Sequence, residues 1–232
     1  VAARNDNGWC GKEYNAEENA FYNWEKNPEG IFGSARGSSN MFWTNGGFNA
    51  LKRGPSGYYQ VDADIYNALS DNDCRKACIL ADDFENDPIY SFENNDSTWY
   101  SYTMPKYTSL KWAASSSIGH NGEMHDNKYT VSDNIYLRTS AVWLMLAEAY
   151  AQSGQDAMAK QTLNKLLEAR TIEGRPTMTC DNTMAGMSTM DMVKLQWRIE
   201  MWGEGDWAFY NQKRWGTQHK RGANHWSNTQ IS

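Results

Sequence analysis

The sequence predicts a mainly α-helical protein with irregular, loop-rich regions and short strands, built on a helical hairpin. Three observations lead to this fold class. Residues 1–132 are interrupted repeatedly by turn-forming clusters such as NPEG, TNGG and RGPSG, because Gly, Pro, Asn and Asp supply turn conformations. From residue 133 onward, apolar residues recur at helical spacing. The most apolar stretch, AVWLMLAEAYAQSG at 141–154, is followed after a short turn by a second helical pattern.

Composition limits the classes of function. The chain has 232 residues, of which 40% are hydrophobic, so it is long and apolar enough to bury a core. Its 22 basic residues are outnumbered by 28 acidic ones, for a net charge of -6. A nucleic-acid partner needs a basic face, so we expect none.

The sequence predicts neither a membrane-spanning helix nor an N-terminal signal peptide. No window approaches the roughly 20 consecutive apolar residues of a membrane-spanning helix, since Arg138, Glu148 and Gln152 interrupt the best candidate. The start, VAARNDNGWC, has neither an initiating Met nor the apolar run of a signal peptide. We therefore expect a processed or excised fragment of a longer protein.

Two of the four cysteines could belong either to a zinc-binding site or to the protein core. Cys74 and Cys78, with His120 and His125 downstream, mimic a zinc-ligand set, but the gap between the two pairs is long for a zinc finger. Buried structural thiols are the preferred interpretation. The acidic runs DNDC and ADDFEND lack the spacing of an EF-hand and are predicted to be solvated turns. We predict neither a metal nor a cofactor.

Within the loop-rich part, one helix is predicted from Asp62 to Leu80, where Ile65, Leu69 and Ala77 recur at helical spacing. The segment NALSDND in its middle is a possible break.

The second part is predicted to be helical from Asp133. One face carries Leu137, Ala141, Leu144, Glu148 and Ala151, and a second helix follows the turn AQSGQD. Two helices joined by so short a turn form an antiparallel hairpin. Its spacing reproduces the tetratricopeptide pattern W-x2-L-G-x2-Y followed by A-x3-F, at Trp143, Leu146, Ala147, Tyr150, Ala159 and Leu163. An ordinary hairpin remains the alternative, because only one copy is present. A repeat cannot bury its apolar face alone, so a helix at about Met190–Met201, or sequence absent from this chain, must cover it.

Three consecutive segments of the second part are NIYLRTSAVWLMLAEAYAQSG, TLNKLLEART and QWRIEMWGEGDWAFYNQKRWG, and the shorter segments NPEGIFG, SDNDCRK and MPKY precede them. Together, over residues 27–216, these segments resemble in kind and in order the C-terminal part of the SusD/RagB family of outer-membrane nutrient-binding lipoproteins. The chain departs from the family at Trp197, where Glu is common, and at DWAFYNQ, which lacks the usual Arg and Asp-Leu. It also lacks the family's N-terminal half and its lipidated cysteine, since Cys10 lies in no lipobox.

The resemblance implies a non-enzymatic glycan-binding protein on the outward-facing surface of the outer membrane. Such a protein delivers oligosaccharides or polysaccharides to a SusC-like TonB-dependent transporter, and is held at the membrane by a lipid anchor that this chain lacks. The resemblance also implies that residues 133–216 form a tetratricopeptide-like scaffold and that residues 1–132 carry the ligand-binding side. Residues 217–232 form a tail.

The chemistry of sugars selects the candidate contacts. A sugar presents apolar C–H faces and hydroxyl edges, which suit aromatic platforms beside amide, carboxylate or Arg groups. Two loop stretches, SSNMFWTNGG and NNDSTWYSY, combine these groups. We predict ligand contacts at Trp43, Asn45, Trp99, Tyr100, Tyr102 and Trp112. Trp99 and Tyr102 share a site only if their segment is a loop or turn.

Other conspicuous side chains are predicted to be structural. Trp143, Trp197, Trp202 and Trp207 belong to the helical pattern, and Arg214 with Trp215 is expected to stack or to pair with Glu200 or Glu204.

Two other functions remain as alternatives. A glycoside hydrolase needs two carboxylates across a cleft, and Glu200 with Glu204 is the best pair available. Both lie on one helix, however, and therefore on one wall of any cleft. A tetratricopeptide protein-interaction scaffold that binds peptides is the other alternative, weakened by the single repeat.

Overall fold

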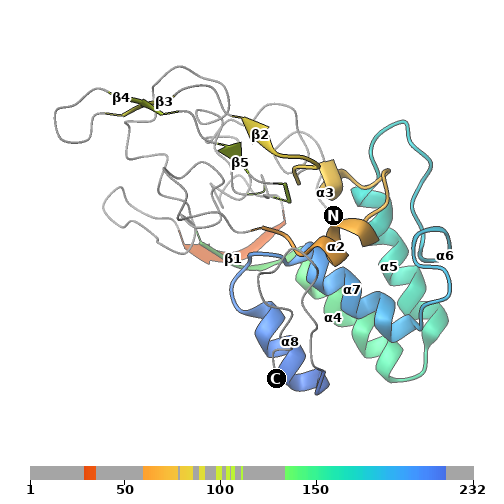
Figure 1. Ribbon diagram of the computed structural model, residues 1–232. Coiled ribbons are helices and arrows are strands. Elements are labelled where there is room, and N and C mark those ends of the chain that lie inside the picture. The colour runs from red at the N-terminus through yellow and green to blue at the C-terminus, as the bar shows by residue number, and fades with distance from the viewer. Residues whose placement is uncertain are drawn as a thin grey trace.

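The computed structural model describes residues 29–34, 60–77, 79–85, 89–91, 98–100, 103–104, 106–107, 111 and 134–217. The helices gather on one side of the molecule, and the pairs of short strands lie on the other (Figure 1). No helix in these ranges combines the length and the apolar character that a bilayer-spanning segment requires. In chain order the elements are β1 Gly30–Ser34, α2 Ala63–Ala68, α3 Cys74–Ala77, β2 Phe84–Glu85, β3 Ile89–Ser91, β4 Thr98–Tyr100, β5 Thr103–Met104, β6 Asn134–Arg138, α4 Thr139–Gln152, α5 Asp156–Arg170, α6 Cys180–Thr183, α7 Thr189–Glu200 and α8 Trp207–Trp215.

The antiparallel hairpin of α4 and α5 forms as the sequence predicts. Its turn requires a left-handed residue, which Gly154 supplies with a φ of 76°, and the Gln155 amide donates to the Tyr150 carbonyl at 2.9 Å. Ala147 and Ala159 are both fully buried. Small side chains at these two positions allow the helix backbones to approach closely.

Only part of the tetratricopeptide pattern points into the core. Leu163 is buried, Trp143 and Tyr150 are half-buried, and Leu146 is 41% exposed. The prediction of a hairpin is therefore confirmed, whereas Leu146, which matches the repeat pattern, lies on the outer face of α4.

A third helix, α7, covers the hairpin as expected and begins close to the predicted residue. Ser188 caps its N-terminus by accepting a hydrogen bond from the Asp191 amide at 3.2 Å. The core between α4, α5, α6 and α7 contains the buried residues Ala141, Leu144, Ala147, Leu163, Leu166, Leu167, Met178, Cys180, Met184, Met192, Val193, Trp197 and Met201. Burial of this apolar surface is what holds the three long helices together.

The helical part begins differently from the prediction. Residues Asn134–Arg138 form strand β6, which pairs antiparallel with β1. Leu137 therefore packs against the core from a strand and not from a helix. The Thr139 amide donates to the Glu29 carbonyl at 2.8 Å, so β1 is tied to the first residue of α4.

The helix predicted from Asp62 to Leu80 is not continuous, and it breaks within NALSDND, where a break was considered. The chain forms the short helices α2 and α3, separated by residues 69–73. Within this break the Asn72 amide donates to Ser70 Oγ at 3.2 Å and the Arg75 amide donates to Asp73 Oδ1 at 2.9 Å. Polar side chains that bond to the backbone in this way compete with the helical hydrogen bonds, which explains the break.

The short strands of the loop-rich part pair locally. β2 pairs with β5, and β3 pairs with β4, both antiparallel. Within this part, the Val61 amide donates to the Tyr107 carbonyl at 2.8 Å. The loop-rich part is joined to the helical side by the Ile172 amide after α5, which donates to the Asn72 carbonyl at 2.8 Å.

The cysteines depart from the prediction at one position. Cys180 is a buried free thiol, as expected, whereas Cys74 is buried but disulfide-bonded. A disulfide-bonded sulfur cannot act as the thiolate ligand that the zinc alternative requires. Among the residues that the structure describes, no group of three or more His, Cys, Asp or Glu side chains is arranged to hold a metal ion.

Candidate ligand-binding surfaces

A cluster of buried charges lies where β6 meets the end of α7. Arg138, the last residue of β6, is 1% exposed, and Glu200, the last residue of α7, is fully buried. Arg138 Nη1 donates to Glu200 Oε1 at 2.7 Å, and Nη2 donates to the Glu200 carbonyl at 2.8 Å. On its other edge, Arg138 donates to both carboxylate oxygens of Glu204, from Nε at 2.7 Å and from Nη2 at 2.6 Å. One guanidinium thus holds the end of α7 and the turn after it.

Strand β1 and helix α5 enter the same cluster. Arg170, at the end of α5, donates from Nη2 to Glu200 Oε1 at 2.7 Å and to Glu29 Oε1 at 2.7 Å. Glu29 also accepts from Arg138 Nη1 at 2.8 Å and from the Ser140 hydroxyl. Glu29 precedes β1, so this carboxylate fixes the strand to both α4 and α5.

The loop-rich part contributes two more cations. Arg75 of α3 donates to Asp73 Oδ2 at 2.6 Å and to Glu200 Oε2 at 2.9 Å. Lys111, which is 1% exposed, donates to Glu204 Oε1 at 2.5 Å and to the Trp202 carbonyl at 2.8 Å. Both cations connect residues before 133 to the C-terminal end of α7.

Charges balance within the cluster, which explains how so many can be buried. Burial alone would raise the pKa of the Glu200 carboxyl, but Arg170, Arg138 and Arg75 hold it well below its ordinary value. Burial alone would lower the pKa of the Arg138 guanidinium, but Glu204 and Glu200 hold it well above its ordinary value. Burial lowers the pKa of the Lys111 ammonium to about 8, despite the neighbouring Glu204.

This charge cluster organises the fold and does not form a catalytic site. Glu200 is fully buried and Glu204 is 3% exposed, and both carboxylates accept hydrogen bonds from Arg138. A glycoside hydrolase needs its two carboxylates to flank a substrate bond in a cleft. The pair considered for that alternative is therefore not placed to act on a substrate.

A second carboxylate holds α8. Glu148 of α4 accepts hydrogen bonds from both terminal nitrogens of Arg214, from Trp197 Nε1 at 3.1 Å and from Trp215 Nε1 at 2.7 Å. The predicted stacking is confirmed, because Arg214 Cζ lies 4.9 Å from the Trp215 ring centre. The alternative, pairing with Glu200 or Glu204, is wrong, because Arg138, Arg170, Arg75 and Lys111 already occupy those carboxylates. The expectation that these two residues hold the fold is consistent with the observed contacts.

The tryptophans of the helical part have structural surroundings. Trp197 is 2% exposed, and its ring lies 5.3 Å from that of Trp207. Trp202 packs against the small apolar cluster formed by α2 and α7. Trp143 is half-buried beneath Lys165, whose ammonium lies 5.6 Å from the ring centre.

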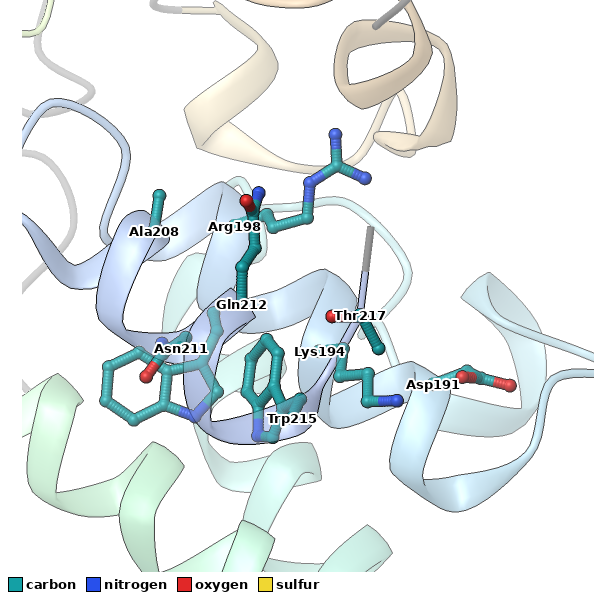
Figure 2. A pocket seen from close by; sticks show the side chains of 9 residues that line it. Asp191, Lys194, Arg198, Ala208, Asn211, Gln212, Trp215 and Thr217 are labelled. Atoms are coloured by element: carbon teal, nitrogen blue, oxygen red, sulfur yellow. The ribbon is translucent and has the colours of Figure 1, made fainter. Parts of the chain in front are cut away.

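Two hollows flank Asn211 of α8. The first, of about 210 Å³, lies between α7 and α8 (Figure 2) and is lined by Asp191, Lys194, Trp197, Arg198, Ala208, Asn211, Gln212, Trp215 and Thr217. The second, of about 250 Å³, lies between α4 and α8 and is lined by Met145, Glu148, Ala149, Gln152, Trp197, Trp207, Asn211 and Arg214. Each hollow combines indole walls with amide and charged groups, and Trp197 and Asn211 line both.

Of the six ligand contacts predicted from the sequence, two lie in a described element. Trp99 and Tyr100 belong to β4, where Trp99 pairs with Tyr90 and Tyr100 pairs with Ile89. In Figure 1, β3 and β4 lie at the end of the loop-rich part that is remote from the helices. Trp43, Asn45, Tyr102 and Trp112 lie outside the described residues. These six positions therefore remain predictions.

Sequence reasoning missed the residues that organise the centre of the molecule. Arg138 and Arg170 interrupt apolar helical patterns in the sequence, and a cation among core-facing positions is a signal of a buried ion pair. Glu29, which lies far away in the sequence, gives no such signal. The hollows at Asn211 were missed as well, because α8 has no pattern that distinguishes a cavity wall from an exposed helix.

Comparisons with known proteins support the same architecture. The SusD family model matches residues 81–231 of the chain. No curated protein matches the sequence. Among solved structures, a SusD superfamily protein from Bacteroides thetaiotaomicron is similar, with a TM-score of 0.56 and 19% identity over 97% of this chain and 48% of that one.

Two further structures are similar in fold. A SusD-like carbohydrate binding protein from Bacteroides vulgatus has a TM-score of 0.51 and 19% identity over 86% of this chain and 37% of that one. A SusD superfamily protein from Bacteroides fragilis has a TM-score of 0.50 and 18% identity over 85% of this chain and 39% of that one. This chain thus spans less than half the length of each of the three proteins. The family match extends over well more than half of the sequence, from the loop-rich part through α8, and the chain therefore belongs to the SusD family.

Proposed function

We propose that this chain is part of a non-enzymatic protein that binds oligosaccharides or polysaccharides for nutrient uptake. The observation that carries the proposal is the family match, which includes residues 81–132 of the loop-rich part and the whole helical scaffold. One protein of similar fold is a SusD-like carbohydrate binding protein. The architecture suits this role, because binding residues are disproportionately carried on loops that a rigid scaffold positions.

Buried ion pairs hold the loop-rich part against the helical scaffold. The loop-rich part is fixed to it by Arg75 and Lys111, whose charged groups are buried and bonded to Glu200 and Glu204. Breaking a buried, hydrogen-bonded ion pair is costly, so the two parts are held in a fixed relation at this point. Lys111 is also the residue before Trp112, one of the six predicted ligand contacts.

A glycan array tests the proposal. We expect the full 232-residue chain to bind at least one oligosaccharide, and we expect Trp43→Ala and Trp99→Ala to weaken that binding by about tenfold or more, equivalent to 1.4 kcal/mol. Phe209→Ala is the matched control, since Phe209 is an aromatic residue of the scaffold that is 54% exposed. If the chain bound peptides but no glycan, the result would instead favour the alternative function, a protein-interaction scaffold.

The proposed partner is a SusC-like TonB-dependent transporter, and the proposed location is the outward-facing surface of the outer membrane, where a lipid anchor holds the protein. The scaffold has exposed apolar side chains that suit a protein partner, namely Val142, Met145 and Leu146 on α4 and Phe209 and Tyr210 on α8. Co-purification of the longer protein with such a transporter tests this. We expect Met145→Glu combined with Leu146→Glu to abolish co-purification without reducing glycan binding.

A further inference from the structure

Asn211 has a buried side-chain amide whose N–H group no described residue accepts. Its side chain is 4% exposed, and its Oδ1 accepts from Arg214 Nε at 3.0 Å. Its Nδ2 donates to no acceptor among the residues that the structure describes. Leaving a buried polar group unsatisfied costs about 1 to 3 kcal/mol, and native proteins rarely do so without water or a ligand. The amide therefore marks a place where an acceptor from outside the chain is expected.

Asn211 is one of the residues that line the hollow between α7 and α8, so this hollow lies next to its amide. Figure 2 shows Trp215 in the middle of this hollow, with Lys194 beside it and Gln212 above. Its volume of about 210 Å³ is below the roughly 300 to 1,000 Å³ of pockets that hold drug-sized ligands. This size suits one sugar ring and is too small for an oligosaccharide. The half-buried indole of Trp215 supplies an apolar surface of the kind that sugar C–H faces contact.

The charges on its rim favour an anion. Lys194 Nζ lies 5.8 Å from the Trp215 ring centre and forms no ion pair with the described residues. Arg198 interacts with Asp62 and Asp64 of α2, and in Figure 2 its guanidinium points away from Trp215. The one carboxylate on the rim, Asp191, already accepts from the Ser188 hydroxyl at 2.6 Å. Lys194 and Asn211 thus supply an ammonium and an amide N–H, both of which are donors.

We propose that this hollow binds a single sugar ring that bears a carboxylate. The carboxylate pairs with Lys194, a ring or hydroxyl oxygen accepts from Asn211 Nδ2, and the ring lies against Trp215. The identity of the ligand as a sugar rests on the proposed function, whereas the unsatisfied donor and the hollow do not. This subsite belongs to the scaffold and is separate from the six contacts predicted in the loop-rich part.

Saturation-transfer NMR and calorimetry on the full chain test the subsite, with D-glucuronate, D-glucose and acetate as probes. We expect D-glucuronate to bind about tenfold more tightly than D-glucose, because only its carboxylate forms a charge-assisted hydrogen bond with Lys194. We expect acetate to give no signal. Equal binding of D-glucuronate and acetate, or no binding of D-glucuronate at millimolar concentration, would overturn the proposal.

Substitutions at Lys194 and Asn211 test whether these two residues contact the ligand. Lys194→Met should lower the affinity for D-glucuronate about tenfold and leave the weak binding of D-glucose unchanged. The matched control is Lys213→Met, which removes an exposed lysine of α8 that lies over Phe209. Asn211→Leu should abolish binding of both sugars, with folding checked by circular dichroism. Equal effects of the two lysine variants would contradict the assignment.

The same variants separate this inference from the proposed function. If Trp43→Ala and Trp99→Ala abolish glycan binding while Asn211→Leu and Lys194→Met change nothing, the proposed function stands and the subsite does not exist. If the chain binds D-glucuronate at this hollow but binds no oligosaccharide on the array, the subsite stands and the proposed function fails.

Discussion

Arg138 and Glu200 lie 62 positions apart in the sequence and meet in the centre of the molecule, where the guanidinium donates to both the carboxylate and the backbone carbonyl of Glu200. Both side chains are almost completely buried. We expect Arg138→Met to lower the free energy of unfolding by about 3 to 5 kcal/mol, because it leaves buried carboxylates without their partner. Urea denaturation followed by circular dichroism measures the change.

The control for this prediction is an exposed ion pair. Lys160 and Asp181 lie 2.9 Å apart, with side chains that are 36% and 78% exposed. We expect Lys160→Met to change the free energy of unfolding by less than about 1 kcal/mol. Similar losses in both variants would show that burial does not determine the strength of these pairs.

Glu148 is the second carboxylate on which the helical part depends. Glu148→Gln keeps the shape of the side chain but replaces one acceptor oxygen with a donor, which then faces the N–H groups of Arg214, Trp197 and Trp215. We expect a loss of about 1 to 3 kcal/mol and faster trypsin cleavage after Arg214 as α8 loosens. Glu168→Gln, at an exposed position of α5, should have no effect on either measurement.

The close approach of α4 and α5 depends on small residues. Ala159 is fully buried at their interface, so Ala159→Leu should destabilise the protein by about 1 to 3 kcal/mol through overpacking. Ala157→Leu, two residues earlier at an exposed position, should remain within about 0.5 kcal/mol of the wild type. Thermal unfolding of the two variants gives the comparison, and an unchanged Ala159→Leu would mean that the helices can separate freely.

The lowered pKa of the Lys111 ammonium should be measurable in the pH dependence of the protein's stability. Burial lowers the pKa of its ammonium to about 8 in the folded state, from an ordinary value of 10.5. Between these two values the unfolded chain binds more protons at this residue than the folded chain does, so the free energy of unfolding gains a contribution that rises with pH. We expect the wild type to gain stability relative to Lys111→Met as the pH is raised from 8 to 10. Parallel curves for the two proteins would contradict the lowered pKa.

Much of the helical scaffold could be predicted because its signals are local. The hairpin of α4 and α5 follows from apolar spacing and from a short turn that contains Gly154. Helix α7 follows from the next apolar pattern, which starts after the cap Ser188. In the loop-rich part, the same kind of signal overestimated one helix, because the side chains of Ser70 and Asp73 bond to nearby backbone amides.

The candidate sites were less accessible to sequence reasoning. Aromatic and amide composition pointed to Trp99 and Tyr100, which the structure places in strand β4. Nothing in the sequence pointed to Asn211, whose importance depends on its burial between α4, α7 and α8 and on an N–H group left over after Arg214 has bonded to its oxygen.

The sequence by itself determined the helices and the small residues at their contacts, because helical periodicity and turn chemistry act over a few neighbouring positions. Only the tertiary structure decided which charges meet. Arg170 pairs with Glu29 across 141 positions, and Arg214 pairs with Glu148 and not with the nearer Glu200. Asn134–Arg138 became a strand because β1, more than a hundred residues upstream, supplies its hydrogen-bond partners. A charge or a strand edge is satisfied by whatever group the fold brings beside it, and that group is not encoded in the local sequence.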